Sequence, residues 1–254
     1  MDARGLPAGK RLDVRDARAR LIVAALPEPG ETVRLTPEEA AHARARRLAA
    51  GDPVLLLDGT GRAAAGHVVR HTRTETLVEV SQMIDAAPRA PSAALLVAGL
   101  RAERLSWLVE KATELGAARV TIVESERTQS FRAAAGLLPR LERIAREAAK
   151  QCERADWPRI DGPVAFARAL DAESAPERFL LDLDGDLFPE RVGGAGAAIA
   201  IGPEGGWTES ERDAASSRGW RIVRLPAGKL RAETAAIAAM VLLRAALEAG
   251  KRER

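Results

Sequence analysis

The sequence predicts an α/β protein in which a small β-barrel with one inserted helix precedes a mainly parallel sheet covered by helices on both faces. Between residues 21 and 84, short apolar strands are separated by turn residues. Pro88 and Pro91 then interrupt both helix and sheet and indicate a linker. Beyond them, apolar strands alternate with helical periodicity, which is typical of a parallel sheet. We therefore expect one domain over residues 18–87 and a second over residues 92–250.

The N-terminal elements follow from apolar runs and turn signals. Strands are expected over residues 21–26, 54–57, 64–69 and 76–80, with turns at Pro29-Gly30 and Asp58-Gly59. A helix is expected to begin near Pro37, with Thr36 as its N-cap. Glu39 would complete a capping box with Thr36. Short strands with one inserted helix favour a small β-barrel.

The C-terminal elements alternate in type. Strands are expected over residues 94–98, 120–123, 179–183, 198–201 and 222–225. Helices are expected over residues 103–115, 137–154 and 233–248, with another that begins at a capping box of Thr208 and Glu211. The last helix is apolar nearly all round, so it is buried in a core or in a subunit interface. The small size of the domain favours an interface, and we expect a homodimer.

Composition excludes some classes and leaves others open. The formal net charge is +3, which is compatible with an RNA partner, but arginine far outnumbers lysine and an ordinary solvated surface explains the charge equally well. The apolar runs are too short to span a membrane, and the single cysteine, Cys152, cannot form an internal disulfide, so we expect a cytoplasmic protein with no membrane contact. Asp182, Asp184 and Asp186 lack calcium-loop spacing, which favours a strand-end turn, and no metal site is expected.

One helix carries a possible RNA-binding stripe. Arg143, Arg146, Lys150 and Arg154 follow one side of the expected helix over residues 137–154, and such a stripe can track phosphates. Interleaved glutamates make a salt-bridged surface equally credible. Cys152 is expected on the apolar side of the same helix as a packed core thiol.

A glycine-rich segment follows the strand expected over residues 198–201. Residues 201–207 read Ile-Gly-Pro-Glu-Gly-Gly-Trp and lead into a helix. Ligands of α/β sheets bind beyond the carboxyl ends of the strands, where glycines allow close approach to the backbone. The segment matches neither a dinucleotide fingerprint nor a phosphate loop. The charge of Glu204 suits a cationic ligand such as a sulfonium, although a tight turn without a ligand is the simpler alternative.

A second strand-end segment contains charge directly before the buried last helix. Residues 225–235 read Leu-Pro-Ala-Gly-Lys-Leu-Arg-Ala-Glu-Thr-Ala. Leu225 and Leu230 are suited to flank a flat ring. Arg231 and Glu233 are either a capping arrangement or functional groups. Loops from neighbouring strands can form one pocket, and we expect these two to do so.

These segments together resemble a known family. The sequence resembles the RsmE family of ribosomal RNA uracil-N3 methyltransferases, which belongs to the SPOUT class. The segments that carry the resemblance are residues 201–207 and 230–235, the upstream runs Arg104-Leu-Ser-Trp107 and Lys111-Ala-Thr-Glu-Leu-Gly116, and the block over residues 146–158. The resemblance covers roughly residues 94–246. It implies a C-terminal SPOUT trefoil-knot domain with a parallel sheet and an N-terminal PUA-like β-barrel that binds RNA. It also implies S-adenosylmethionine as methyl donor and 16S ribosomal RNA in the small ribosomal subunit as partner.

The resemblance assigns roles residue by residue. Arg231 is expected to orient the uracil and stabilise its charge, and Glu204 is expected to accept the proton or only to fix the loop. The expected RNA contacts are Arg101, Lys111, Arg127 and Arg154. The expected cofactor contacts are Ile201, Gly202, Pro203, Gly205, Gly206, Leu225, Gly228, Leu230 and Thr234. The alternatives are a SPOUT methyltransferase acting on another RNA base or a ribose, and a non-catalytic RNA-binding assembly factor.

Overall fold

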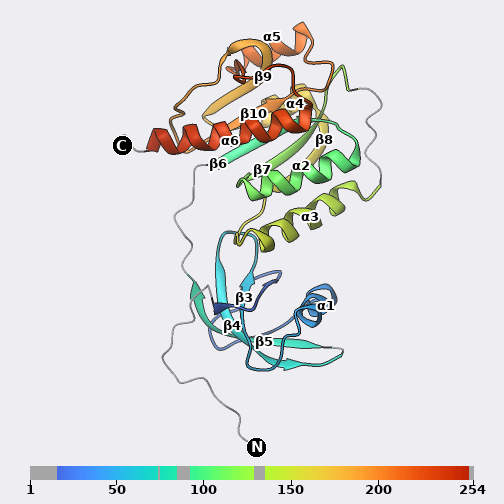
Figure 1. Cartoon of the computed structure of the whole chain (residues 1–254), viewed down its shortest axis with the longest axis vertical. Coiled ribbons are helices and arrows are strands. Elements are labelled where there is room, and N and C mark those ends of the chain that lie inside the picture. The colour runs from blue at the N-terminus through green and yellow to red at the C-terminus, as the bar shows by residue number, and fades with distance from the viewer. Residues whose placement is uncertain (1–15, 74, 85–91, 129–134, 252–254) are drawn as a thin grey trace, which may run out of the picture. The chain divides into compact units, whose positions relative to one another are not determined.

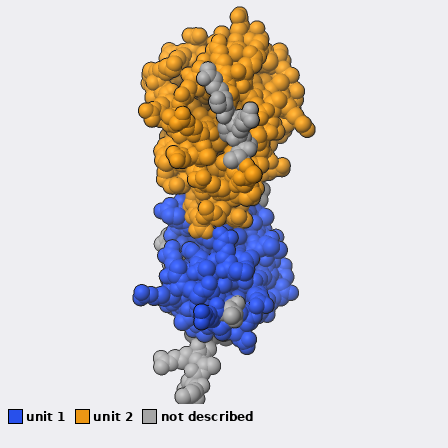
Figure 2. All heavy atoms as spheres, turned by 90° about the vertical axis from the view of Figure 1, so that its right-hand side faces the viewer, with its two compact units in different colours: residues 1–89, 150–156 blue, residues 90–149, 157–254 orange. Residues whose placement is uncertain are grey.

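The computed structural model describes residues 16–73, 75–84, 92–128 and 135–251 (Figure 1). The chain divides into two compact units (Figure 2), one of residues 1–89 with 150–156 and one of residues 90–149 with 157–254. The expected linker at Pro88 and Pro91 lies outside the described residues. Among the described helices, none is both long enough and apolar enough to cross a membrane.

The N-terminal unit contains a five-stranded sheet in the order β1-β3-β4-β5-β2. Its strands are β1 (Ala19–Ile22), β2 (Thr32–Arg34), β3 (Pro53–Leu57), β4 (Ala63–His71) and β5 (Thr76–Ile84). The predicted closed barrel is not formed by these strands, because β1 pairs only with β3 and β2 only with β5, which leaves the sheet open. The prediction also missed β2, whose three residues are too few to show a periodicity.

Helix α1 (Pro37–Ala45) begins where the sequence predicts, with the Thr36 side chain accepting a hydrogen bond from the Glu39 amide at 3.3 Å. The second half of the predicted capping box is wrong. The Glu39 carboxylate instead accepts from the Ile22 amide at 3.1 Å and from Lys150 Nζ at 2.6 Å. The side chains of Glu39 and Lys150 are 7% and 6% exposed. A buried ammonium requires a carboxylate partner, and this requirement overrides the local cap.

The C-terminal unit contains the predicted parallel sheet, with six strands in the order β11-β9-β10-β6-β7-β8 and every neighbouring pair parallel. The strands are β6 (Ser92–Ala98), β7 (Arg119–Glu124), β8 (Arg159–Ala165), β9 (Glu177–Leu187), β10 (Gly196–Ile201) and β11 (Arg221–Arg224). The helices are α2 (Ala102–Glu114), α3 (Leu137–Gln151), α4 (Phe166–Ala172), α5 (Glu209–Ser217) and α6 (Ala232–Lys251).

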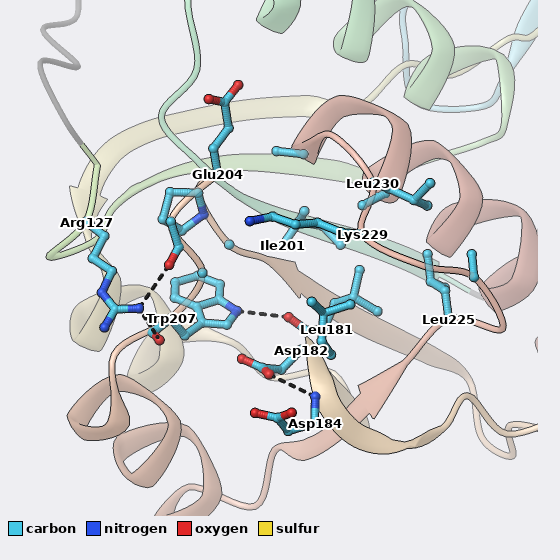
Figure 3. A pocket seen from close by; sticks show the side chains of 18 of the residues that line it. Arg127, Leu181, Asp182, Asp184, Ile201, Glu204, Trp207, Leu225, Lys229 and Leu230 are labelled. Atoms are coloured by element: carbon cyan, nitrogen blue, oxygen red, sulfur yellow. Dashed lines mark hydrogen bonds between the residues drawn. The ribbon is translucent and has the colours of Figure 1, made fainter.

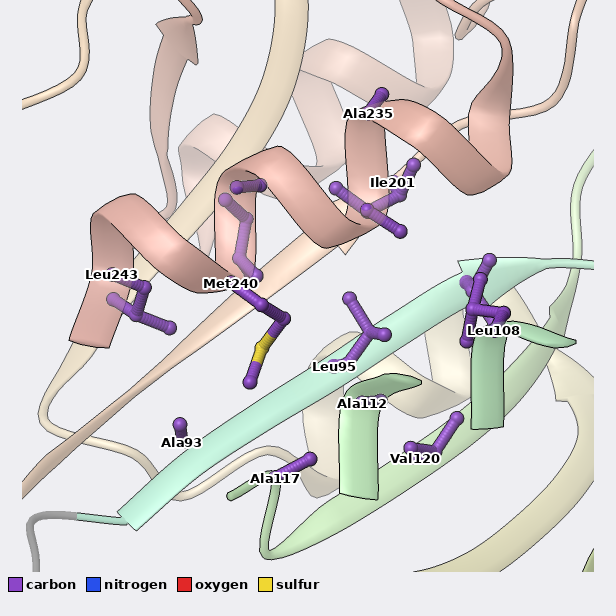
Figure 4. Close-up of a cluster of buried hydrophobic side chains, with 14 of the residues drawn as sticks. Ala93, Leu95, Leu108, Ala112, Ala117, Val120, Ile201, Ala235, Met240 and Leu243 are labelled. Carbon is purple, nitrogen blue, oxygen red and sulfur yellow. The ribbon is translucent and has the colours of Figure 1, made fainter. Parts of the chain in front are cut away.

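Helices cover this sheet on both faces because the central strands are apolar on both sides. Leu95 of β6 and Ile199 of β10 belong to a core shared with α2, α3 and α6, and Figure 4 shows Met240 of α6 close to that side of the sheet. The alternate residues, such as Leu96 and Ala200, face a second core built with α4 and α5. Side chains alternate across a strand, so two cores on one strand require a layer on each face.

Several predicted boundaries are wrong for identifiable reasons. Strand β8 was missed because it contains Gly162 and Pro163, which an edge strand tolerates. Asp182, Asp184 and Asp186 lie within β9 rather than in a turn, since β9 continues to Leu187 alongside β11.

The RNA-binding stripe predicted on the helix over residues 137–154 is not continuous. Helix α3 ends at Gln151, so Cys152 follows the helix and is only half-buried. Arg154 also lies beyond the helix, and Lys150 is buried against Glu39. Of the four basic residues, the two that lie on the helix and are not buried are Arg143, which is exposed, and Arg146, which is half-buried.

Candidate functional site

A cavity of about 300 Å³ lies beyond the carboxyl ends of β10 and β11 and beside β9 (Figure 3). Both loops singled out in the sequence line it, the first after β10 and the second after β11. Of the expected cofactor contacts, those that line the cavity are Ile201, Gly202, Pro203, Gly205, Gly206, Leu225, Gly228 and Leu230. Two strand-end loops therefore meet around one space, where α/β folds bind ligands.

Trp207 holds the first loop in place by ring packing and one hydrogen bond. Its indole is 2% exposed, stacks on Phe166 at 4.2 Å between ring centroids, and donates from Nε1 to the carbonyl of Leu181 at 3.1 Å. A Cβ added at Gly202 would lie 3.0 Å from the indole, so this position favours glycine. Gly206 has a φ of +71° and donates to the Pro203 carbonyl at 2.9 Å, which closes the turn. The glycines thus serve the turn and its packing.

Helix α5 begins directly after this loop with the predicted capping box. Thr208 and Glu211 exchange hydrogen bonds between side chain and backbone. The other carboxylate oxygen of Glu211 accepts from the Glu126 amide at 2.9 Å, and Ser210 donates to the Glu126 carboxylate at 2.9 Å. The cap therefore connects the loop after β7 to the loop after β10.

Arg127 strengthens the same connection and lines the cavity. Its Nη1 donates to the carbonyl of Gly205 at 2.9 Å and to the carbonyl of Trp207 at 3.2 Å (Figure 3). The sequence assigned Arg127 to RNA contact. In the structure its guanidinium orders the glycine loop, which satisfies two carbonyls that the sharp turn leaves unpaired.

Arg104 was quoted in the sequence pattern but given no role, and it lies between the two loops. Its Nη1 donates to the Glu204 carboxylate, and its Nε lies 3.6 Å from Oε1 of Glu233 in the first turn of α6. The hydrogen bond to Glu204, together with the charge of Glu233, raises the pKa of Arg104 above its usual range. Only the fold could reveal this contact, because Arg104 and Glu204 are 100 residues apart.

The second loop provides apolar surface and exposed charge. Leu225 is buried, Leu230 is half-buried, and Ala227 and Lys229 complete its part of the lining. Arg231 is exposed and does not line the cavity, although its neighbours on both sides, Leu230 and Ala232, do. The Arg231 carbonyl accepts from the Ala235 amide at 2.8 Å, which starts α6. Thr234, an expected cofactor contact, is exposed on α6 and is not part of the lining.

Strand β9 forms a third wall that the sequence did not predict. Leu181, Asp182, Leu183 and Asp184 line the cavity. The Asp182 side chain is 10% exposed and lies 3.6 Å from Nη1 of Arg212, which also lines the cavity. The alternation of leucine and aspartate in β9 could have indicated a strand at a ligand site, but the same pattern is equally typical of a turn.

The structure does not gather the remaining expected RNA contacts around the cavity. Arg101 is exposed directly before α2. Lys111 is held by Glu110 at 2.7 Å and Glu114 at 2.8 Å, and these hydrogen bonds raise its pKa. Arg154 belongs to the N-terminal unit and pairs with Asp156 at 2.6 Å.

Comparisons with known proteins show similarity to RNA methyltransferases. The model of the RNA methyltransferase domain matches residues 88–244. The chain is 31% identical over 240 residues to ribosomal RNA small subunit methyltransferase E of Synechocystis sp., covering 90% of this chain and 78% of that protein. It is 29% identical over 228 residues to the protein of the same name from Mycobacterium bovis, covering 85% and 87%.

Solved structures show the same likeness. The ribosomal RNA small subunit methyltransferase E from Neisseria gonorrhoeae bound to S-adenosyl methionine superposes with a TM-score of 0.79 at 26% identity, covering 88% of this chain and 95% of that one. A methyltransferase from Legionella pneumophila in complex with the same cofactor gives a TM-score of 0.80 at 25% identity, covering 90% and 97%.

Proposed function

Since the chain belongs to the RNA methyltransferase family that contains ribosomal RNA small subunit methyltransferase E, we propose that it transfers a methyl group from S-adenosylmethionine to N3 of a uridine in 16S ribosomal RNA. The observation that carries the proposal is the cavity enclosed by the loops after β10 and β11. Its two loops hold the motifs in which the sequence resembles the RsmE family, and the chemistry of its lining fits the methyl donor.

The residues of the cavity suit the adenine, the ribose and the ammonium of S-adenosylmethionine. Ile201, Leu225 and Leu230 offer apolar surface for a flat adenine ring. The glycines of both loops, which carry no side chain, leave room for the ring edge and the ribose to approach the backbone. The carboxylates of Asp182 and Asp184 match a positively charged ammonium. Bound there, the cofactor supplies an activated methyl group on a cationic sulfonium.

The protein must hold N3 in line with that methyl group and stabilise the charge that spreads onto O2 and O4 of the uracil. Arg231 is the proposed group for this charge, because it is exposed between two cavity-lining residues. Glu204 either accepts the N3 proton or fixes the first loop. The N-terminal unit over residues 18–87 is proposed to bind the RNA, and Arg101, Lys111 and Arg154 are proposed as further contacts.

Methylation of small subunits that lack the modification tests the proposal. The purified chain is incubated with such subunits and labelled S-adenosylmethionine, and digested RNA is analysed by mass spectrometry. We expect 3-methyluridine at one position. Arg231→Ala should lower kcat by about 100- to 1,000-fold while the fold and most cofactor affinity are retained. Label on another base or a ribose would replace the proposed substrate, and failure to bind S-adenosylmethionine in calorimetry would favour a non-catalytic assembly factor.

We further propose that two copies associate through α6. Val241 is 47% exposed and Ile237 is half-buried, while other residues of the same helix fill the core, with Ala238 and Leu242 half-buried against it. Exposed apolar surface on a helix of this kind is typical of an interface. Val241→Glu should convert a dimer into a monomer in analytical ultracentrifugation, and a wild-type chain that sediments as a monomer at micromolar concentration would contradict this.

The C-terminal segment is proposed to form the trefoil knot of its class. Strand β11 lies at the edge of the sheet beyond β9, yet α6 follows it and packs on β10, β6 and α2. The chain therefore crosses back over its own strands. A threaded segment should dock slowly, so the C-terminal unit should refold from denaturant more slowly than the N-terminal unit, and equal rates would contradict the knot.

A further inference from the structure

We propose that Arg104 is a positioning residue that holds the two loops of the cavity together, and that Glu204 tethers the first loop through Arg104 rather than accepting the substrate proton. The inference rests on the proposed function for its catalytic consequence. Its structural part concerns three side chains of the C-terminal unit, Arg104, Glu204 and Glu233.

The contacts place one guanidinium between two carboxylates, one in the loop after β10 and one in the first turn of α6. Arg104, in the first turn of α2, donates from Nη1 to Glu204, which belongs to the loop after β10. Its Nε lies 3.6 Å from Oε1 of Glu233, which directly follows the loop after β11. The planar fork of arginine presents several donors at fixed angles, whereas a lysine ammonium is a single point charge. Arginine can therefore engage both carboxylates from separate nitrogens at a fixed spacing, which a flexible lysine side chain does not impose.

The burial of Glu233 makes this contact necessary. Its side chain is 13% exposed, and among the described residues its Oε2 atom is buried without a hydrogen-bond partner. A carboxylate in such surroundings is stable only beside a cation. Ala232 and Ala235 of the same helical turn line the cavity, so a displacement of Glu233 would move that wall. Arg104 thus stabilises both a charge and the position of α6.

The geometry of Glu204 is that of a tether. Its side chain is 64% exposed, and Figure 3 shows it pointing away from Leu181 and Trp207, which lie on the other side of the loop backbone. Glu204 is among the residues that line the cavity, but its carboxylate is engaged by Arg104 of α2. A general base must reach the proton that it removes.

The first experiment compares Arg104→Met with Arg218→Met. Arg218 is a matched control, because its side chain is also 33% exposed and forms an ion pair with an exposed carboxylate, Asp171, on α4. Hydrogen exchange is measured without cofactor over residues 202–207 and 226–231. We expect faster exchange in both loops of Arg104→Met and unchanged exchange in Arg218→Met. Exchange that is unchanged in Arg104→Met, or changed equally in both variants, would overturn the proposal.

The second experiment separates positioning from simple loss of stability. Arg104→Met should weaken S-adenosylmethionine binding about tenfold in calorimetry and lower kcat roughly 100-fold, because small displacements of a site are costly. Adding Glu233→Gln should restore part of the affinity, since the buried carboxylate is then neutral. Arg104→Lys should recover less than the double variant. Affinity that falls further in the double variant would overturn the role assigned to Glu233.

Glu204→Gln tests the tether directly, because a glutamine oxygen still accepts a hydrogen bond from Arg104 but cannot take a proton. We expect kcat within about tenfold of the wild type and a pH–rate profile of unchanged shape. A loss of more than about 100-fold with a lost acidic limb would make Glu204 the base and overturn the inference. If the wild type neither binds S-adenosylmethionine nor methylates RNA, the proposed function fails, while the exchange data still decide whether Arg104 joins the loops.

Discussion

Replacing Arg127 by methionine separates two roles that its position permits. The sequence resemblance places Arg127 among RNA contacts, whereas the structure shows its guanidinium bound to the carbonyls of Gly205 and Trp207 at 2.9 and 3.2 Å. Methionine keeps the length and apolar character of the stem but removes both donors. The variant therefore distinguishes an Arg127 that orders the first loop of the cavity from an Arg127 that binds RNA.

The magnitude follows from the two hydrogen bonds. A bond from a charged donor contributes about 1.5–3 kcal/mol where it is shielded from water. Arg127 is exposed, so screening reduces the pair to about 1–2 kcal/mol of loop stabilisation. If the cofactor binds only the ordered loop, its Kd rises roughly five- to thirtyfold. The KM for small subunits should change little.

The assay is calorimetric titration with S-adenosylmethionine, followed by steady-state methylation at saturating cofactor. Arg127→Lys serves as a charge-retaining comparison, because it keeps the positive charge but replaces the planar guanidinium with a compact ammonium. Arg168→Met, an exposed arginine on α4, controls for the loss of one surface charge. An unchanged cofactor Kd combined with a raised KM for the RNA substrate would refute the loop role and restore the RNA assignment.

Three further changes should have measurable effects. Lys150→Met should destabilise the N-terminal unit by about 3–5 kcal/mol in denaturant unfolding, because it leaves the buried Glu39 without its cation. A double variant that also neutralises Glu39 should lose clearly less stability. Equal losses in the single and the double variant would contradict the ion-pair argument. Gly202→Val should lower thermal stability by about 1–3 kcal/mol and weaken cofactor binding, since its side chain would collide with Trp207; an unchanged melting temperature would contradict this packing. Asp171→Asn should melt earlier than the wild type at neutral pH. The hydrogen bond from its arginine partner lowers the pKa of Asp171 below its ordinary 3.8, so the stabilisation is present above that pH and lost as the pH falls through the folded-state value; a difference that persists in strong acid would contradict the sign.

Local patterns were sufficient for much of the fold. Apolar runs and capping residues placed the central strands and the starts of α1 and α5, because strand burial and helix caps depend on neighbours within a few residues. They failed at β2, which is too short, and at β8, where Gly162 and Pro163 mask an edge strand. They also failed for Glu39, whose carboxylate was expected at its own helix end but is taken by Lys150, 111 residues away.

The sequence by itself determined the chemical character of the two loops: a glycine turn after one buried strand and an apolar and basic loop after the next, within a segment that matches the RNA methyltransferase domain. Only the tertiary structure decided which groups support that chemistry. In the fold, Arg104 lies between Glu204 and Glu233, and Arg127 donates to carbonyls of the glycine loop. Strand β9 lines the cavity with Asp182. The physical reason is that a turn or a cap depends on adjacent residues, whereas charge pairing between distant segments depends on the order in which the strands join the sheet.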